Sequence, residues 1–434
     1  MKKLLCILLF SSFSISAFSQ APNLKQIIDQ KADELNEQVI EWRRYFHEHP
    51  ELSNREFNTA KKIEEHLESL GMEVQTEVAH TGVVGILRGG QPGPVIGLRA
   101  DIDGLPVTER TDVPFKSIAR GEYQGNQVGV SHACGHDTHI AILMGVANIL
   151  TDMQEDLQGT VKFIFQPAEE GAPAGEEGGA ALMVKEGVLK NPDVDAIFGL
   201  HIAAQQPVGT IEYRSEGIMA SVNSFSIRVK GKQAHGSAPW DGVDPIVTSA
   251  QIINNIQTIV SRNMQLTDQA AVVTVGIIRG GVRNNIIPED VYMEGTIRAL
   301  NEDMRQLIFK RLETIVQNTA ESNGAEAELT INKGYPITYN DPELTAQMAS
   351  SLEATAGSDK LKIRNAITGA EDFSFFQEEV PGLYFFLGGM PNAANLADVA
   401  GHHTPDFYID ESGLKLGVRA MSNLVVDYMT SVED

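Results

Sequence analysis

The sequence predicts an α/β protein into which a second, α+β domain is inserted. Three observations lead to this prediction. Short apolar runs rich in β-branched residues alternate with helical periods in the first half of the chain. Polar residues directly follow several of these runs, as they do at the carboxyl ends of strands in open α/β sheets. Residues 221–335 instead show the order β-α-β-β-α-β, which is that of a ferredoxin-like module.

The N-terminal part predicts helices followed by alternating strands and helices. Residues 23–70 have a helical period, interrupted near His49 and Pro50, and Gly71 suits the end of a helix. An apolar helix is predicted at 140–150. Strands are predicted by the β-rich runs at residues 83–88, 95–100, 161–165 and 196–200. Carboxylates, amides or a histidine follow three of these strands, so we expect a site at that edge of the sheet.

The inserted domain is predicted to span residues 219–335, with connections near Gly217 and Tyr335. The α/β pattern resumes after Tyr335, so residues 21–218 and 336–434 are expected to form one catalytic, metal-binding domain. Within the insertion, periodicity predicts in turn a strand, a helix, two strands, a helix and a strand. These elements are expected at residues 224–230, 244–263, 272–278, 291–300, 303–323 and 327–333.

The first twenty residues predict a cleaved export signal. Lys2 and Lys3 precede an apolar run at residues 4–10, and Ala17 and Ser19 fit a small-x-small cleavage site. The run is too short to span a bilayer. We therefore expect residues 1–20 to be removed, and the mature protein to be periplasmic or secreted and not inserted in a membrane.

Charge and cysteine content narrow the possible partners. The formal net charge of −24 argues against nucleic acid and against anionic membrane surfaces as partners. Cys6 lies in the predicted signal, so Cys134 is the one cysteine of the mature chain. A lone thiol in an exported protein needs an explanation, and metal ligation provides one.

The octet at residues 132–139 predicts a metal site. It holds three of the eleven histidines and one of the two cysteines of the chain. Thiolate, imidazole and carboxylate bind zinc-like divalent ions. In an extended stretch, Cys134 and His136 point to one side, and Gly135 lets the backbone approach an ion. A buried free cysteine beside surface histidines is the alternative, and the density of ligand types favours metal.

Two further motifs carry groups suited to metal chemistry. Glu169 and Glu170 follow an apolar strand and a proline, so one carboxylate could bind metal while its neighbour takes a proton from water. A solvated acidic pair is the alternative. His201 ends its own predicted strand and is a possible further ligand. Adjacent histidines, His402 and His403, precede a Thr-Pro pair that favours extended backbone.

Taken together, these motifs resemble the di-metal aminoacylase and carboxypeptidase superfamily. More narrowly, the chain is similar to the amidohydrolase branch of hippurate hydrolases, plant auxin-conjugate hydrolases and N-acetyl-diaminopimelate deacetylases. The resemblance implies a zinc-peptidase-like catalytic domain, with a central mixed sheet and helices on both faces, plus an inserted lid and dimerisation domain. The matching segments are residues 99–103, 132–139, 165–170, 199–201, 234–237, 285–288, 369–373 and 403–405.

The resemblance also implies roles for individual residues. Glu169 falls on the general base, and His235 on a residue that can reach the active site of a partner subunit and steady the oxyanion. Asn285 and Arg298 fall near positions that hold the substrate, although a structural ion pair is an equal alternative for Arg298. Asp101 and His139 match positions beside the site. The metal ligands fall on Cys134, His136, Glu170, His201 and His403.

The expected activity is metal-dependent hydrolysis of the amide bond of N-acyl amino acids. One or two divalent ions per subunit are implied, of manganese, zinc, cobalt or nickel, and a homodimer through the inserted domain. A metallo-carboxypeptidase or dipeptidase that acts on short peptides would use the same groups. A non-catalytic metal- or peptide-binding protein is the alternative from another class, and an intact Glu169 beside a complete ligand set argues against it.

Overall fold

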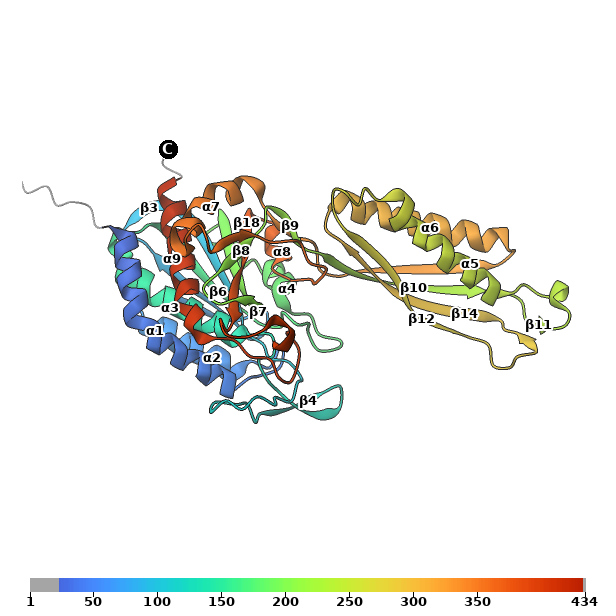
Figure 1. The fold of residues 1–434 in the computed structure, drawn as a ribbon, viewed down its shortest axis with the longest axis horizontal. Helices are drawn as coiled ribbons and strands as arrows, with labels where there is room; N and C mark the ends of the chain where they lie inside the picture. The colour runs from blue at the N-terminus through green and yellow to red at the C-terminus, as the bar shows by residue number, and fades with distance from the viewer. Residues whose placement is uncertain (1–22, 432–434) are drawn as a thin grey trace, which may run out of the picture.

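The computed structural model describes residues 23–431 and has two parts (Figure 1). One part is built on an eight-stranded mixed sheet with helices around it, and the other is an elongated α+β unit that extends from it. The predicted α/β class with a central mixed sheet is confirmed. The predicted export signal at residues 1–20 lies outside the described residues. None of the described helices is long and apolar enough to cross a membrane.

The large sheet has parallel strands at its centre. Its order is β1-β2-β6-β3-β7-β18-β8-β17, in which β6, β3, β7 and β18 run parallel. β1, β2 and β8 each pair antiparallel with a neighbour. The central strands are apolar and almost wholly buried, as expected for parallel strands covered on both faces. The strands are β1 (Glu73–Val78), β2 (Gly82–Arg88), β3 (Gln91–Asp101), β6 (Gln158–Gln166), β7 (Ala196–Pro207), β8 (Ile211–Tyr213), β17 (Leu361–Ile363) and β18 (Gly382–Met390).

Two cores, one on each face, hold this sheet between helices. Phe163 and Phe165 of β6 pack with α1, α2, α3, α7 and α9, while Ile164 between them packs with α4 and α8 on the other face. This alternation follows from the two-residue period of a strand. The helices are α1 (Leu24–Glu48), α2 (Phe57–Ser69), α3 (His136–Asp152), α4 (Gly179–Lys185), α7 (Pro342–Ala356), α8 (Ser374–Gln377) and α9 (Leu414–Ser431).

The α+β unit has its own sheet and its own core. Its antiparallel sheet has the order β12-β14-β10-β15, and the chain order is the predicted β-α-β-β-α-β. Buried apolar residues alternate along β10 and face the two helices. We call this part, from β10 to β15, the inserted unit. Its elements are β10 (Ser221–Lys230), α5 (Pro245–Thr258), β12 (Ala271–Gly280), β14 (Asp290–Ala299), α6 (Glu302–Ser322) and β15 (Glu326–Lys333).

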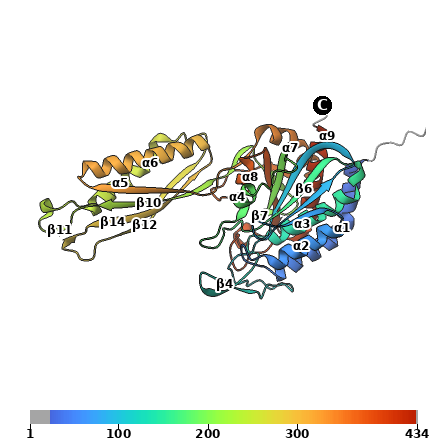
Figure 2. The ribbon, with the colours of Figure 1, turned by 180° about the vertical axis from the view of Figure 1, so that it is seen from behind.

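Small elements complete the chain. The predicted helix at 244–263 is shorter than expected, because α5 ends at Thr258 and a π-helical turn, Ile259–Asn263, follows. A hairpin of β4 (Arg120–Tyr123) and β5 (Asn126–Gly129) projects from the large part. β11 (Ala234–His235) pairs with β13 (Ile286–Ile287) at the end of the inserted unit farthest from the large sheet (Figures 1 and 2).

The two connections to the inserted unit lie side by side. β9 (Glu216–Met219) enters it and β16 (Thr338–Asn340) leaves it, and these two short strands pair antiparallel. The predicted connections near Gly217 and Tyr335 therefore meet at one place. The backbone N–H of Val222 donates to the carbonyl of Tyr335 at 3.0 Å, which ties the first residues of β10 to the exit segment.

Candidate metal centre

The polar residues meet where the parallel strands end and α3 begins. Asp101 is the last residue of β3, and Glu169 follows β6 by three residues. β3 and β7 are aligned with Arg99 opposite Gly199, so His201 lies level with Asp101. The expectation that His201 ends its strand is wrong, because β7 continues to Pro207. The expected site edge is nevertheless where these groups gather.

The octet is bent, not extended as the sequence suggested. Gly135 has φ 97°, and His136 is the first residue of α3. A Cβ atom at Gly135 would lie 2.4 Å from Cγ2 of Ile202, so a larger residue fits neither the backbone nor the space. The bend, and not a strand, brings the Cys134 thiol and the His136 imidazole to one place. The predicted helix at 140–150 therefore starts earlier, inside the motif.

Thiol, imidazole and carboxylate converge around Cys134. Its Sγ lies 3.4 Å from Nε2 of His201 and 3.2 Å from Nε2 of His403. Nε2 of His403 lies 2.9 Å from Oε1 of Glu170. Ligand atoms of Cys134, His136 and His201 lie within 4.8 Å of one another, as do those of Cys134, Glu170 and His403. The five residues that the resemblance implies as ligands thus form two overlapping groups that share the thiol.

Backbone contacts orient two of the imidazoles. Nδ1 of His136 donates to the carbonyl of Asp103 at 2.9 Å, and Nδ1 of His201 donates to the carbonyl of Ile202 at 2.5 Å. In the neutral form of each ring, Nε2 is then the unprotonated atom, as in histidines that ligate metal. Nε2 of His136 is buried and has no hydrogen-bond partner within the described residues. A buried ring nitrogen without a hydrogen-bond partner, next to a thiol and carboxylates, suits a bound cation that would replace its proton.

His403, not His402, presents its ring to the cluster. Nδ1 of His402 donates to the carbonyl of Cys134 at 3.1 Å, and its Nε2 accepts from the N–H of Ala204 at 3.1 Å. His403 has φ 62°, which is uncommon for a residue other than glycine. Its N–H donates to the carbonyl of Ala133 at 2.8 Å. His402 therefore braces the backbone of the octet, while the strained conformation of His403 directs its imidazole toward Cys134.

Asp101 and His139 lie beside the cluster and bind each other. Nδ1 of His139 is 2.5 Å from Oδ1 of Asp101, and its Nε2 accepts from the N–H of Ile202 at 2.8 Å. Both nitrogens of His139 are thus occupied. Oδ2 of Asp101 lies 3.7 Å from Nε2 of His136 and 2.8 Å from Nη1 of Arg99. Asp101 therefore lies next to Nε2 of His136, the ring nitrogen that would face a bound cation.

The charges of the cluster are unbalanced without a cation. Burial raises the pKa of the Cys134 thiol well above its usual value, and the carboxylates of Glu170 and Glu169 raise it further. Burial, together with Glu371 and Glu170, also raises the pKa of Glu169. Burial works against protonation of His136, yet Asp101 and Asp103 raise the pKa of its imidazole to about 10. Protons balance the crowded anions here, and a bound cation would replace them.

A network of buried charged side chains adjoins the cluster. Arg99 donates to Asp101, to Glu371 at 2.9 Å and to Asp372 at 2.9 Å, and all four side chains are buried. The hydroxyl of Tyr384 donates to Glu371 at 2.6 Å. Arg99, Glu371 and Asp372 were not predicted as site residues. The signal in the sequence was an arginine within an otherwise apolar strand, where a buried charge requires partners.

The remaining site residues lie in the inserted unit. His235 in β11 and Asn285, whose carbonyl accepts from the N–H of Gly236 at 2.8 Å, are neighbours at its far end. Both are exposed and separate from the cluster within one chain. Arg298 lies at the other end of β14, opposite Val222, and its burial lowers the pKa of its guanidinium. The chain by itself therefore does not bring His235 and Asn285 to the metal cluster.

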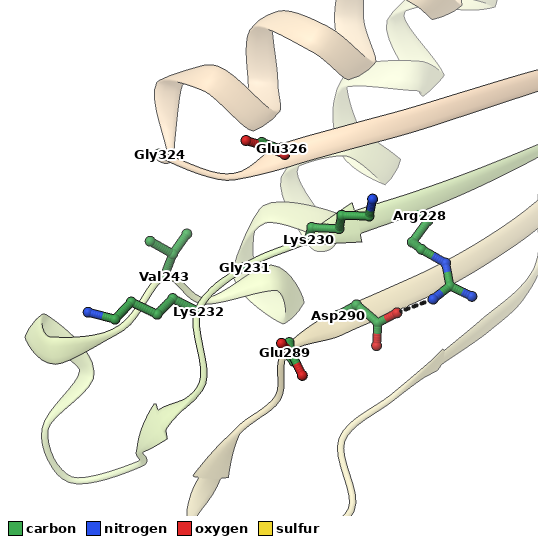
Figure 3. Close-up of a pocket in the computed structure, with 9 residues that line it drawn as sticks. All are labelled: Arg228, Lys230, Gly231, Lys232, Val243, Glu289, Asp290, Gly324 and Glu326. Carbon is green, nitrogen blue, oxygen red and sulfur yellow. Dashed lines mark hydrogen bonds and ion pairs between the residues drawn. The ribbon is translucent and has the colours of Figure 1, made fainter.

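The inserted unit also has a charged cavity of about 690 Å³ at the distal ends of its strands (Figure 3). Arg228, Lys230 and Lys232 line it together with Glu289, Asp290 and other residues. Arg228 is paired with Asp290 at 2.7 Å, and Lys230 is paired with Glu328. The basic groups are thus largely neutralised on an exposed surface.

Comparison with known proteins identifies the family. Residues 97–427 match the model of peptidase family M20/M25/M40. The chain belongs to this family. Thermostable carboxypeptidase 2 of Saccharolobus solfataricus is 39% identical over 94% of this chain and 99% of its own length. N-acetylcysteine deacetylase of Bacillus subtilis is 37% identical over 91% of this chain and 98% of its own length.

A solved structure extends this likeness to the metal chemistry. The YXEP protein of Bacillus subtilis, a dinuclear metal-binding peptidase of the M20 family, is 34% identical over 92% of this chain and 99% of its own. Its TM-score is 0.75. The present chain is accordingly a metal-dependent amidohydrolase that uses divalent metal ions. The predicted family, fold class and enzyme class are confirmed.

Proposed function

We propose that this enzyme hydrolyses N-acyl amino acids to a free amino acid and a carboxylic acid. The observation that carries the proposal is the convergence of one thiol, three imidazoles and one carboxylate around Cys134, with the Glu169 carboxylate 3.8 Å from Nε2 of His136. This donor set suits one or two ions of manganese, zinc, cobalt or nickel. The ligands proposed are Cys134, His136, Glu170, His201 and His403.

The residues of the chain divide the work of amide hydrolysis. Divalent ions, when bound, polarise the amide carbonyl and make water more acidic. Glu169 takes a proton from the attacking water and delivers it to the leaving amine. Burial raises the pKa of Glu169, and cations bound beside it would lower that pKa and keep the carboxylate ready to accept a proton. Because water is the nucleophile, no serine or cysteine nucleophile is needed. Cys134 is instead one of the proposed ligands.

A carboxypeptidase or dipeptidase activity on short peptides is the second candidate. The thermostable carboxypeptidase of Saccharolobus solfataricus, at 39% identity, favours it. The deacetylase of Bacillus subtilis favours N-acyl amino acids instead. Both reactions cleave an amide beside an amino acid, so the same cluster and the same base serve either one. The acyl group is what distinguishes them.

Release of free amino acid from a substrate panel tests the proposal. The panel holds N-acetyl and N-benzoyl amino acids and dipeptides of the same amino acids. The enzyme is first stripped of metal with a chelator and then reloaded with each metal in turn. We expect turnover of N-acyl amino acids that disappears on chelation and returns with metal. Faster turnover of dipeptides would replace the first candidate by the second. Binding without turnover by metal-loaded enzyme would favour the non-catalytic alternative.

Cys134→Ala is predicted to lower metal occupancy and activity together. The thiol belongs to both ligand groups, so its loss weakens both. Loss of a partner that only supports a ligand reduces metal affinity by about 10- to 100-fold, and loss of the shared thiol is expected to exceed this. Elemental analysis of purified protein measures the effect. His49→Ala, which removes an exposed imidazole elsewhere, is the control. Unchanged metal in folded Cys134→Ala protein would refute the assignment.

We propose further that the protein is a homodimer through the inserted unit, and that His235 stabilises the oxyanion in the site of the partner subunit. The separation of His235 from the cluster of its own chain supports this arrangement. His235→Ala is expected to lower kcat and to leave the metal content unchanged. Mixing His235→Ala with Glu169→Gln subunits should restore part of the activity. Mixed dimers without recovered activity would place His235 in its own subunit's site or outside the chemistry.

Export is proposed on the basis of residues 1–20 alone. The Lys2-Lys3 pair, the apolar run and the small-x-small site support it. Expression of the full chain in a bacterial host, followed by fractionation and N-terminal sequencing, tests this proposal. A mature N-terminus near residue 20 in the exported fraction is expected. Full-length protein retained in the cytoplasm would contradict export.

A further inference from the structure

Two buried acidic side chains accept hydrogen bonds from the backbone of the segment that carries Glu169. Ala168 has φ 52°, a left-handed conformation that is strained for alanine. Its N–H donates to Oε1 of Glu56 at 2.9 Å, and the N–H of Glu170 donates to Oδ2 of Asp103 at 3.1 Å. Glu56 and Asp103 are both buried. The peptide before Ala168 and the peptide after Glu169 are therefore hydrogen-bonded to the large part of the molecule.

The third contact to this segment comes from the exit of the inserted unit. The hydroxyl of Tyr335 donates to the backbone carbonyl of Glu169 at 2.8 Å. Tyr335 lies between the end of β15 and the start of β16, and its own carbonyl accepts from Val222 at the start of β10. Its ring contacts Phe375 of the large part edge-on, with ring centroids 5.9 Å apart. Tyr335 thus lies on the exit from the inserted unit and contacts both the first strand of that unit and the segment of the proposed base.

We propose that Tyr335 is a positioning residue that couples the placement of the inserted unit to the Glu169 carboxylate. A rotation of the inserted unit about its paired connections acts on the backbone at Tyr335, and the hydroxyl passes that displacement to the Glu169 peptide. Proton transfer requires hydrogen-bond distance, and a shift of about 1 Å can cost 10²-fold in rate. This inference rests on the proposed role of Glu169 as the base.

Tyr335→Phe tests the contact with little other change. It keeps the ring and its contact with Phe375, and removes only the hydroxyl. We expect kcat to fall about 10- to 100-fold, with KM, metal content and melting temperature close to wild type. Tyr339→Phe is the matched control, because Tyr339 lies on the same exit segment, is exposed and makes no side-chain hydrogen bond within residues 23–431. It should leave kcat unchanged.

Combination with Glu169→Gln separates positioning from other roles. If Tyr335 acts through Glu169, then Tyr335→Phe should not lower the residual turnover of the Glu169→Gln enzyme any further. A loss of the same factor in both backgrounds would overturn the proposal, as would normal kcat in Tyr335→Phe or a fall accompanied by lost metal or a lowered melting temperature. The role of Glu169 as the base is tested separately by the single variant, because normal turnover of Glu169→Gln would rule it out.

Discussion

Glu169→Gln is expected to keep its metal and to lose most of its turnover. The amide has nearly the size of the carboxylate, so the cluster and the backbone contacts of Ala168 and Glu170 remain in place. It accepts no proton at neutral pH, and removal of a positioned acid–base group costs about 10²- to 10⁴-fold in rate. Steady-state kinetics on an N-acyl amino acid, with elemental analysis of the same sample, measures both effects.

Glu170→Gln is the matched control for this result. The two glutamates are adjacent in sequence, but Glu170 lies 2.9 Å from His403 and shares a ligand group with Cys134. Its replacement should lower the metal content first, with activity partly restored by excess metal. Glu169→Gln should show the opposite pattern, in which added metal restores nothing. Near-normal kcat in Glu169→Gln would remove the base from the mechanism.

Arg99→Met is expected to destabilise the large part of the molecule by about 3–5 kcal/mol, the range found when one partner of a buried ion pair is removed. Arg99 is fully buried and contacts Asp101, Glu371 and Asp372. Methionine fills much of its volume but leaves these carboxylates without a counter-charge. Burial raises the pKa of Asp372 to about 8 although Arg99 opposes that rise, so loss of the guanidinium should raise this pKa further.

Urea unfolding followed by the fluorescence of Trp42 measures this loss. Trp42 lies on α1 in the large part, and a Trp240→Phe background removes the signal of the second tryptophan, which lies in the inserted unit. Arg88→Met is the control, because its pair with Glu73 is exposed, lies in the same part of the molecule as Trp42, and should change the free energy of unfolding by no more than about 1 kcal/mol. Equal, small effects of the two substitutions would contradict the structural role of Arg99.

The sequence predicted the groups of the candidate site better than their geometry. Cys134, His136, Glu170 and His403 stand in motifs whose residue types already indicate metal chemistry, and the structure brings them together. The bend at Gly135 was not predicted, because a Cys-Gly-His run is compatible with both an extended chain and the turn that starts α3. His201 was expected at a strand end, since nothing local shows that β7 continues to Pro207.

The features that could not be predicted from the sequence depend on contacts between segments that are distant in the chain. Arg99 meets Glu371 and Asp372 only because the fold brings the end of β3 to the segment before α8, and strand order is a property of the whole fold. The contact of Tyr335 with Glu169 likewise joins residues 166 positions apart. The elements of the inserted unit were predicted well because their alternation and helical period are local. The separation of His235 from the cluster is not local, and no pattern near residue 235 encodes it.

Anomalous diffraction from crystals of manganese-loaded protein locates the ions among the candidate ligands and so tests the assignment of the metal centre. We expect anomalous peaks beside Sγ of Cys134, bounded by Nε2 of His136, His201 and His403 and by the carboxylate of Glu170. The described residues offer other groups of possible ligands, including Asp101 with His139 and Glu371 with Asp372. Peaks at those places, with none beside Cys134, would contradict the proposed ligand set.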